Sequence, residues 1–184
     1  MITTIALLEL SSIASGFETE DAMLKAGAVD LILARTICSG KYLIIVSGDV
    51  DAVKASIAAG KQTGTGYIVD ELVIPHVHPS IFPALTASVD LPPERRDALG
   101  IVETFSAASA ISGADVACKT ADIVLFRLHL AMAIGGKGYF CFTGDVASVR
   151  AAVDAAVDSV SQTGLLAGKS IIPRPRQDLF KEIL

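Results

Sequence analysis

Several hallmarks of common protein functions are missing from this chain of 184 residues. It has no run of Lys or Arg, and 20 acidic against 15 basic residues give a net charge of −5, so nucleic acid is not an expected partner. Its three cysteines are odd in number and lack CxxC spacing, which argues against a disulfide framework. No Ser-His-Asp set, P-loop or dinucleotide-binding fingerprint is apparent, so the sequence does not indicate an enzyme.

Membrane-spanning and targeting patterns are also missing. The longest stretch without a charged side chain, residues 72–89, contains Pro75, Pro79 and Pro83, so it is a poor spanning helix. The first residues lack a basic region, and Glu9 interrupts the first apolar stretch, so no targeting signal is expected. We therefore expect a soluble cytosolic protein with no membrane partner.

Charged side chains are scarce. They make up 19% of the chain, against about 25% in an average globular protein, and the mean hydropathy is +0.57. An Ala-rich core would explain part of this surplus of apolar residues. Small domains cannot hide so much apolar surface internally, however, so we interpret the surplus as surface that lies in protein–protein contacts.

What is present is an internal repeat. Polar residues recur 94 positions later, in the pairs Glu9 and Glu103, Asp21 and Asp115, and Lys25 and Lys119. Beyond one loop the spacing becomes 96, because Gly48-Asp49-Val50 recurs as Gly144-Asp145-Val146. The repeat predicts two similar domains, residues 1–88 and 97–184, joined by a linker over about residues 87–96 that contains Pro92-Pro93.

Each copy has the same order of predicted elements: strand, helix, strand, strand, helix, strand. Hydrophobic patterns in the first copy predict strands at 5–10, 29–34 and 42–46 and a helix at 17–26. The second copy repeats them at 99–104, 123–130, 139–142 and 111–120. Asp49 and Asp145 are placed to cap the second helix of each copy. The predicted fold class is α/β (α+β), with the ferredoxin-like split βαβ arrangement present twice.

Local signatures now converge on one family. They are Glu near the end of the opening strand, Asp-x-x-x-Lys on the first helix, a Gly-Lys loop, Gly-Asp-Val, and the closing Ile171-Ile172-Pro173-Arg174-Pro175. Together they resemble the bacterial microcompartment shell domain (BMC domain) over essentially the whole chain. The duplication resembles the tandem-domain shell proteins that form trimers, and is most similar to the T-type shell proteins of propanediol-utilization microcompartments.

The resemblance implies a flat, pseudo-hexameric homotrimer that tiles with other shell proteins into the polyhedral shell of a bacterial microcompartment. Such a protein is structural rather than an enzyme. The resemblance also places three basic residues at the outer edge, in lateral contacts with neighbouring tiles: Lys25, Lys119 and Arg174.

The loop at which the two copies diverge is the main candidate for a functional site. The first copy reads Thr36-Ile37-Cys38-Ser39-Gly40-Lys41, and the resemblance implies that both loops line a central pore, with the lining residues Ser39, Gly40, Ile134, Gly135 and Gly136. It further implies that Cys38 from each of three chains binds one [4Fe–4S] cluster, which passes electrons across the shell to or from a redox enzyme such as a flavoprotein or corrinoid reductase. Gly40 permits a tight turn, and Lys41 could favour the thiolate electrostatically.

Two alternatives remain open. The tile could be a pore for small metabolites without a cluster, in which Cys38 is incidental. The chain could instead be a small-ligand-binding or regulatory enzyme on a tandem ferredoxin-like scaffold, although the missing catalytic constellation disfavours it.

The remaining candidates receive structural interpretations. Cys118 and Cys141 are expected in the core, because their counterparts in the first copy are Leu24 and Ile45. His76 and His78 could bind a metal, but their counterparts are arginines, which favours a polar edge. Glu9 and Glu103 are expected to satisfy backbone donors rather than to form an acid–base pair.

Overall fold

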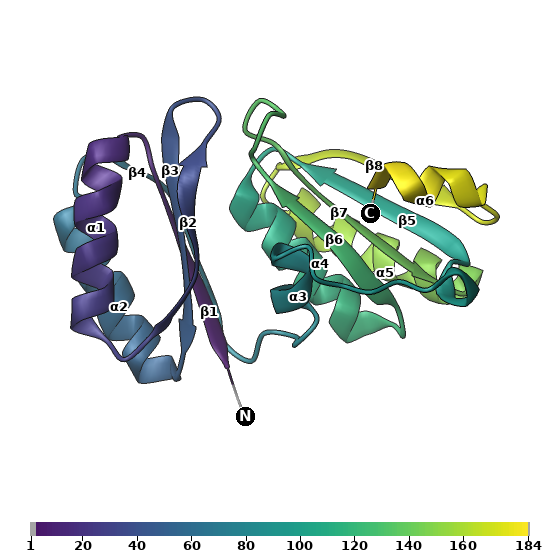
Figure 1. The fold of residues 1–184 in the computed structure, drawn as a ribbon, viewed down its shortest axis with the longest axis horizontal. Coiled ribbons are helices and arrows are strands. Elements are labelled where there is room, and N and C mark those ends of the chain that lie inside the picture. The colour runs from purple at the N-terminus through teal and green to yellow at the C-terminus, as the bar shows by residue number, and fades with distance from the viewer. Residues whose placement is uncertain (1–2, 184) are drawn as a thin grey trace. The chain divides into compact units, whose positions relative to one another are not determined.

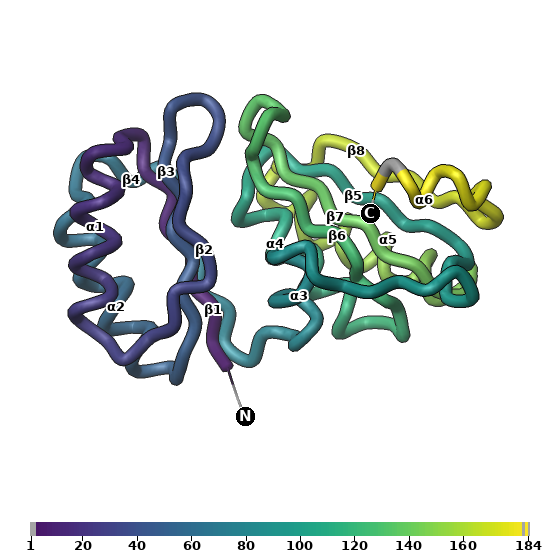
Figure 2. Tube along the Cα trace, viewed as in Figure 1, coloured from purple at the N-terminus to yellow at the C-terminus, as the bar shows by residue number. Residues whose placement is uncertain are grey.

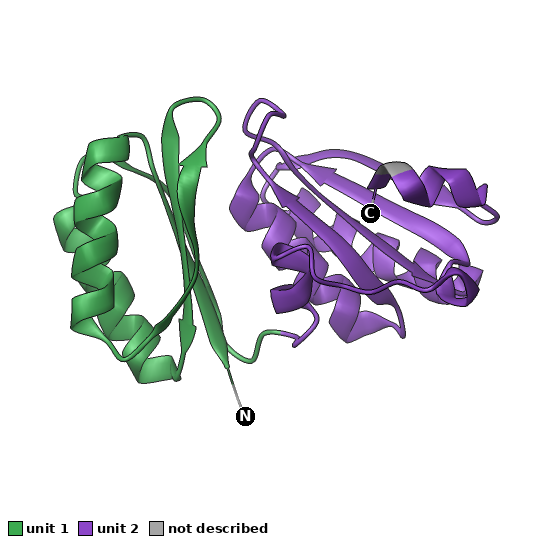
Figure 3. Ribbon diagram, viewed as in Figure 1, with its two compact units in different colours: residues 1–77 green, residues 78–184 purple. Residues whose placement is uncertain are grey.

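The chain folds as two compact units, residues 1–77 and residues 78–184 (Figure 3). The structure is a computed structural model, and it describes residues 3–183. Each unit contains a four-stranded antiparallel sheet with two long helices on one face (Figure 1). The order of elements predicted for each copy and the α/β fold class are confirmed. No helix in the described part of the chain is long and apolar enough to cross a membrane.

Unit 1 has its strands in the order β2-β3-β1-β4. Its elements are β1 (Thr4–Leu10), α1 (Ile13–Ala26), β2 (Asp30–Ile37), β3 (Lys41–Gly48), α2 (Val50–Thr63) and β4 (Ile68–Ile74). Alternate side chains of a strand point to the same face of the sheet, so Ala6, Leu8 and Leu10 of β1 form one core with Ile44 and Val46 of β3. Met23 of α1 and Val53 of α2 close this core from the helical side.

Unit 2 repeats this arrangement with the strand order β6-β7-β5-β8. Its elements are α3 (Ile81–Leu85), a 3-10 helix η1 (Pro93–Arg95), β5 (Ala98–Thr104), α4 (Ala107–Thr120), β6 (Val124–Leu130), β7 (Gly138–Gly144), α5 (Val146–Ser161), β8 (Leu166–Ile172) and α6 (Gln177–Ile183). A second core lies on the other face of this sheet, where Phe180 of α6 packs with Leu99, Phe126 and Cys141.

The contact between the first helix and the third strand is filled by different residues in the two copies. A Cβ atom on Gly16 of α1 would lie 2.5 Å from Cδ1 of Tyr42, at the start of β3. In unit 2 the equivalent helix residue is Ala110, and the equivalent strand residue is Gly138, whose Cβ would lie 2.7 Å from that of Ala110. Unit 1 therefore places a tyrosine ring against a helix glycine, whereas unit 2 places only a methyl group against a strand glycine, so the helix and the strand meet without a large side chain between them in unit 2.

The division into units differs from the boundary expected from the repeat alone. The units divide between Val77 and His78, so α3 belongs to unit 2 although its sequence ends the first copy. It packs against β6 and α4, and its residues Ile81, Ala84 and Leu85 are buried (Figure 1). Apolar burial on the second copy therefore decides where this helix lies.

The first helix of each copy starts four residues before the predicted position. The Ser12 hydroxyl accepts a hydrogen bond from the Ser15 amide at 3.2 Å, and Ser106 does the same for Ser109 at 3.1 Å. Each serine is thus the N-cap of its helix, which is a signal that the apolar periodicity does not contain. Of the two predicted aspartate caps, Asp145 accepts from two backbone amides, whereas Asp49 makes no side-chain cap hydrogen bond.

Candidate functional site: the two divergent hairpin loops

The loop that carries Cys38 is the turn of the β2–β3 hairpin (Figure 2). Ile37 pairs with Lys41 across the two strands, so Cys38, Ser39 and Gly40 form the turn. Ile37 is buried, Cys38 is half-buried, and the two following residues are exposed. Gly40 has φ +74°, and a Cβ atom built on it would have no heavy atom within 4 Å. The left-handed turn expected of this glycine is confirmed, and the tip of the loop is not packed.

The corresponding turn of the β6–β7 hairpin is two residues longer. Ala131 donates its amide to the carbonyl of Lys137 at 2.8 Å, which closes a turn over residues 132–136. Ala133, Gly135 and Gly136 have positive φ values of 60°, 66° and 85°. The change in repeat spacing from 94 to 96 is therefore located in these turns.

His129 fixes the base of the second loop. Its ring stacks on Tyr139 with centroids 5.2 Å apart, and its Nε2 lies 2.8 Å from the carbonyl oxygen of Met132. The sequence shows no metal-ligand motif beside His129, so it predicts no role for this residue. The contact is structural, since it joins two strands to the loop between them.

An ion pair recurs below both loops. Lys41 contacts the Oε1 atom of Glu9, and Lys137 Nζ lies 2.9 Å from Oε1 of Glu103. The lysines, rather than backbone donors, are therefore the partners of these glutamates, and the prediction for the glutamates is corrected. The ammonium group of Lys41 that was expected to favour a thiolate is engaged by Glu9. The recurrence of Glu and Gly-Lys in both copies was the available sequence signal.

The two other cysteines lie in the core, as predicted. Cys118 and Cys141 are buried, and burial raises the pKa of each thiol to about 12. A smaller contribution from Asp115 acts in the same direction on Cys118, whereas Arg127 opposes the shift at Cys141. Thiols in this state are poor ligands and poor nucleophiles.

The basic residues expected at the outer edge lie on surfaces of their units. Lys25 Nζ is 2.5 Å from Asp21, and Lys119 Nζ is 2.6 Å from Asp115. These are the (i, i+4) pairs of the Asp-x-x-x-Lys signature, and Arg174 is exposed. Their role in lateral assembly stays a prediction.

The two candidate histidine ligands, His76 and His78, lie in different environments. His76 is exposed with φ 54°, whereas the amide of His78 donates to Oδ1 of Asp115 at 2.7 Å. Within the described residues, no group of three His, Cys, Asp or Glu side chains is placed to hold a metal ion. The structural interpretation of the two histidines stays a prediction.

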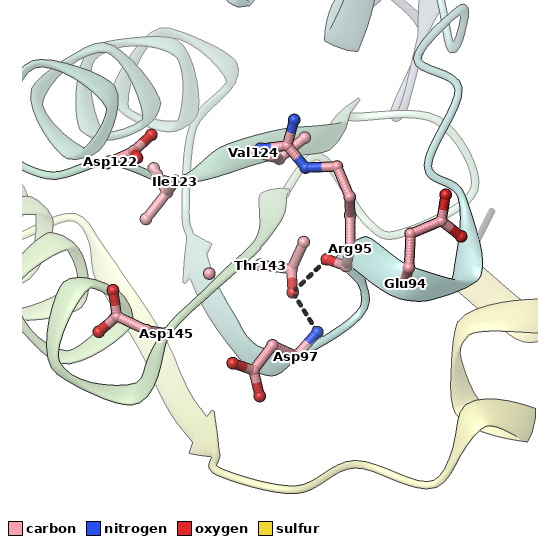
Figure 4. A pocket seen from close by; sticks show the side chains of 9 residues that line it. Glu94, Arg95, Asp97, Asp122, Ile123, Val124, Thr143 and Asp145 are labelled. Carbon is pink, nitrogen blue, oxygen red and sulfur yellow. Dashed lines mark hydrogen bonds between the residues drawn. The ribbon is translucent and has the colours of Figure 1, made fainter.

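A polar pocket of about 220 Å³ lies beside the start of β5 in unit 2 (Figure 4). The side chains of Asp97, Asp122 and Asp145 at its margin point in different directions. Thr143 of β7 joins this strand to the residues that precede β5. Its Oγ1 accepts a hydrogen bond from the Asp97 amide at 3.1 Å and donates to the Arg95 carbonyl at 3.4 Å. We interpret the pocket as a solvated crevice of the inter-copy linker.

A second surface feature is an apolar groove on unit 1, between α1 and the edge strand β2. It is lined by Phe17, Leu24, Leu31, Ala34 and Tyr42, with Glu20 and Asp21 also at its wall. Phe17 is 59% exposed, and its ring centroid lies 4.8 Å from that of Tyr42. The Tyr42 hydroxyl donates to Glu20 at 2.7 Å. Burial, and then this carboxylate, raise the pKa of Tyr42 to about 12, so the hydroxyl remains a donor.

Comparison with known proteins identifies the family. The BMC domain matches residues 4–77 and 98–175. The shell protein PduT of Citrobacter freundii is 44% identical and covers 100% of this chain and 99% of its own. A crystal structure of a microcompartment protein from Desulfitobacterium hafniense is also 44% identical, with a TM-score of 0.94 over 98% of this chain and 99% of that one.

A more distant structure shares the fold alone. The fused permuted hexameric shell protein of the RMM microcompartment is 21% identical, with a TM-score of 0.63 over 88% of this chain and 85% of that one. The repeat, the two sheets of matching strand order and the full-length similarity agree with one another. The chain belongs to the BMC domain family and carries two copies of that domain.

Proposed function

We propose that this protein is a structural tile of a bacterial microcompartment shell, a homotrimer with one [4Fe–4S] cluster bound by three Cys38 thiolates in its central pore. The observation that carries the proposal is the position of Cys38 in the turn of the β2–β3 hairpin, because this turn is where the two copies differ in length. The similarity to PduT over the whole chain supports the shell role and the location in the shell.

The open groove on unit 1 supports an assembly of several chains. Its counterparts in unit 2 are Ile111, Cys118, Leu125 and Leu128, and all of them are buried where α3 lies against α4 and β6. Phe17 and Leu31, by contrast, are exposed. One copy of the domain therefore has this surface covered within its own chain, and the other copy does not.

The repeat supports one segment as the cover of the open groove. Ile81-Phe82 of α3 corresponds to Leu179-Phe180 of α6 at the same spacing of 98 that relates Ile74 to Ile172. We infer that α6, which stays anchored to its own sheet through Phe180, presents its remaining surface to the α1–β2 groove of the next chain. Such a head-to-tail contact uses two different surfaces and closes into a ring when the rotation permits. Three chains with two domains each then give the pseudo-hexameric outline.

The assembly is tested by a charge in the groove. Phe17→Glu and Leu31→Glu should each convert the trimer into monomers in light scattering after size-exclusion chromatography, because an unpaired carboxylate would be buried in the contact. Val69→Glu is the matched control, since Val69 is 50% exposed on β4 outside the groove. A trimeric Phe17→Glu protein contradicts the proposed contact.

The donor set of one chain fits the cluster only within such a trimer. Iron–sulfur clusters are held by cysteine thiolates, and the turn of one chain offers a single one. Threefold symmetry would bring three Cys38 side chains to one axis and leave one iron for a further ligand. When bound, the cluster supplies one-electron transfer between the two sides of the shell. The residues of this chain hold the thiols, exclude large solutes from the pore and keep the loops in register.

The proposed partners follow from the same assembly. Lys25, Lys119 and Arg174 contact neighbouring tiles, which are other shell proteins of the same family. A redox enzyme of the flavoprotein or corrinoid reductase class exchanges electrons with the cluster. The function is structural and electron-conducting, and the protein has no catalytic role of its own.

Spectroscopy of anaerobically prepared protein tests the cluster. The wild type should be brown, with the broad visible absorption of thiolate-bound iron, and should give an EPR signal after reduction. Cys38→Ser should be colourless yet trimeric, while Cys118→Ser keeps the colour because its side chain lies in the core. A coloured Cys38→Ser protein refutes the assignment.

The second candidate function is a pore for small metabolites without a cluster. Gly40 and Gly135 favour it, because a Cβ atom at either position would have no neighbour within 4 Å. This alternative predicts no iron in the trimer after anaerobic reconstitution, together with unchanged permeability in Cys38→Ser.

A further inference from the structure

The Glu9–Lys41 ion pair joins the strand β1 to the cysteine hairpin at the start of β3, directly beside the turn. Glu9 is opposite Leu43 of β3, and Lys41 lies two residues before Leu43, so the two charged side chains are diagonal neighbours on one face of the sheet. Lys41 is also opposite Ile37, the residue that precedes Cys38. A displacement of Lys41 would therefore be transmitted to both strands of the hairpin and to the turn between them.

The same pair differs in its surroundings between the two copies. The side chains of Lys41 and Glu9 are 24% and 3% exposed, whereas those of Lys137 and Glu103 are 40% and 41% exposed. A solvated pair contributes little, because water screens the charges and the long side chains lose entropy. Removing one partner of a desolvated pair leaves a buried charge without compensation. Breaking the Glu9–Lys41 pair should therefore cost more than breaking the Glu103–Lys137 pair.

Ser39 and Gly40, at the tip of the turn, provide no comparable anchor. Ser39 is exposed, and the position of a Cβ atom on Gly40 has no neighbour within 4 Å. On the side of the turn that leads into β3, Lys41 is thus the first residue with a side chain fixed to another strand. On the opposite side, burial of Ile37 has the same effect.

We propose that Glu9 and Lys41 are the positioning pair of Cys38: together they set the place of its thiol relative to the pore axis. The inference rests on the proposed cluster, since a ligand set on a symmetry axis must hold each donor within about 0.5 Å. Changes to residues that orient metal ligands typically lower metal affinity by about 10–100-fold. The pair on the second copy has no ligand to orient.

The test uses the full-length chain and four variants. Glu9→Gln and Lys41→Gln break the pair, the double reversal Glu9→Lys/Lys41→Glu restores it with opposite polarity, and Glu103→Gln is the matched control. Two quantities are measured: iron per trimer after anaerobic reconstitution, and the rate at which Cys38 of metal-free protein reacts with Ellman's reagent at fixed pH. The two core thiols react slowly in the folded protein, because burial raises the pKa of each to about 12.

Both single variants should lose affinity for iron by about tenfold or more, and their thiol rate should change severalfold. The double reversal should recover most of both, and Glu103→Gln should match the wild type. A folded Glu9→Gln trimer with wild-type iron and thiol rate overturns the inference, as does an equal loss in Glu103→Gln. If Glu9→Gln fails to fold, Lys41→Gln and the double reversal decide the question by the same two measurements.

Failure of the proposed function is distinguishable from failure of this inference. If wild-type protein binds no iron, the cluster is excluded, while the thiol rates of Glu9→Gln and Glu103→Gln still show whether the pair positions Cys38. If iron binds in Cys38→Ser as in the wild type, the ligand assignment is wrong whatever the glutamate variants show.

Discussion

Replacing Phe180 with alanine should detach the helix α6 from the sheet of unit 2. The Phe180 side chain is fully buried, and its ring centroid lies 5.9 Å from that of Phe126. The Arg96 guanidinium carbon is 5.8 Å from the same ring, and this arginine also donates to the carbonyl of Leu91. Phe180 thus connects the end of the chain, the linker between the copies and the outer face of the sheet.

The expected loss of stability follows from these contacts. Truncation of a buried phenylalanine to alanine costs about 3–5 kcal/mol. The half-buried Leu179 and Ile183 would keep about 2 kcal/mol of apolar burial between them. Fixing the backbone of seven residues costs about 1 kcal/mol for each residue, and a helix of two turns is not stable alone. Detachment of α6, rather than a cavity under an intact helix, is therefore the expected response.

Cys141 reports the detachment, because it lies in the same cluster as Phe180 and is buried. In a Cys38→Ser background, Phe180→Ala should make one further thiol per chain react rapidly with Ellman's reagent, and the urea midpoint should fall. Phe82→Ala, at the equivalent position of α3, is the control that should leave Cys141 unreactive. If Cys141 remains unreactive toward Ellman's reagent and the urea midpoint is unchanged in Phe180→Ala, the packing argument is refuted.

Three further predictions concern the caps, the core and the edge. Asp145→Ala should lower the melting temperature at neutral pH more than Asp49→Ala, because only Asp145 accepts amide hydrogen bonds at its helix. These hydrogen bonds lower the pKa of Asp145. Its contribution to stability is therefore fully present above the ordinary carboxyl pKa and is lost as the pH falls through the lowered pKa. Gly60→Ala should destabilise unit 1 by about 1–3 kcal/mol in urea titrations, since its Cβ would lie 2.6 Å from Leu8 Cδ1, and an unchanged midpoint would contradict this. Arg174→Ala should abolish extended sheets in electron microscopy while the trimer persists in light scattering; intact sheets would exclude the proposed edge contact.

The sequence was sufficient for the parts of the fold that depend on periodicity. Two copies at a fixed spacing, each with alternating or helical apolar patterns, predicted both sheets and the four long helices in the correct order. The starts of α1 and α4 were missed, because serine caps such as Ser12 act through a single hydrogen bond and leave no periodic trace. The helix α3 is not among the predicted elements, since its five residues are placed by burial against α4 and β6 rather than by local propensity.

The sequence located the candidate loop but not the contacts that hold it. The spacing change identified the divergent loop and its cysteine, but Glu9 and Lys41 are 32 positions apart and meet only through the register of β1 and β3. Register depends on which residues of two strands face each other, and this follows from the packing of the whole sheet. Contacts of this kind determine how a loop is held. The sequence does not show that Glu9 and Lys41 meet, so it predicted backbone donors as the partners of the glutamates.

Duplication gives this arrangement a chemical consequence that one domain repeated six times would lack. With identical domains, any residue of the pore loop would occur six times around the axis, and six thiolates would crowd a site that a cluster fills with about four. In the tandem chain, Cys38 occurs once per chain, and its place in the second copy is taken by a longer turn with Gly135 and Gly136. The buried pair below one loop and the solvated pair below the other follow the same division. The trimer proposed above would bring together three Cys38 thiols, one from each chain, so one cysteine per chain would suffice for the proposed ligand set.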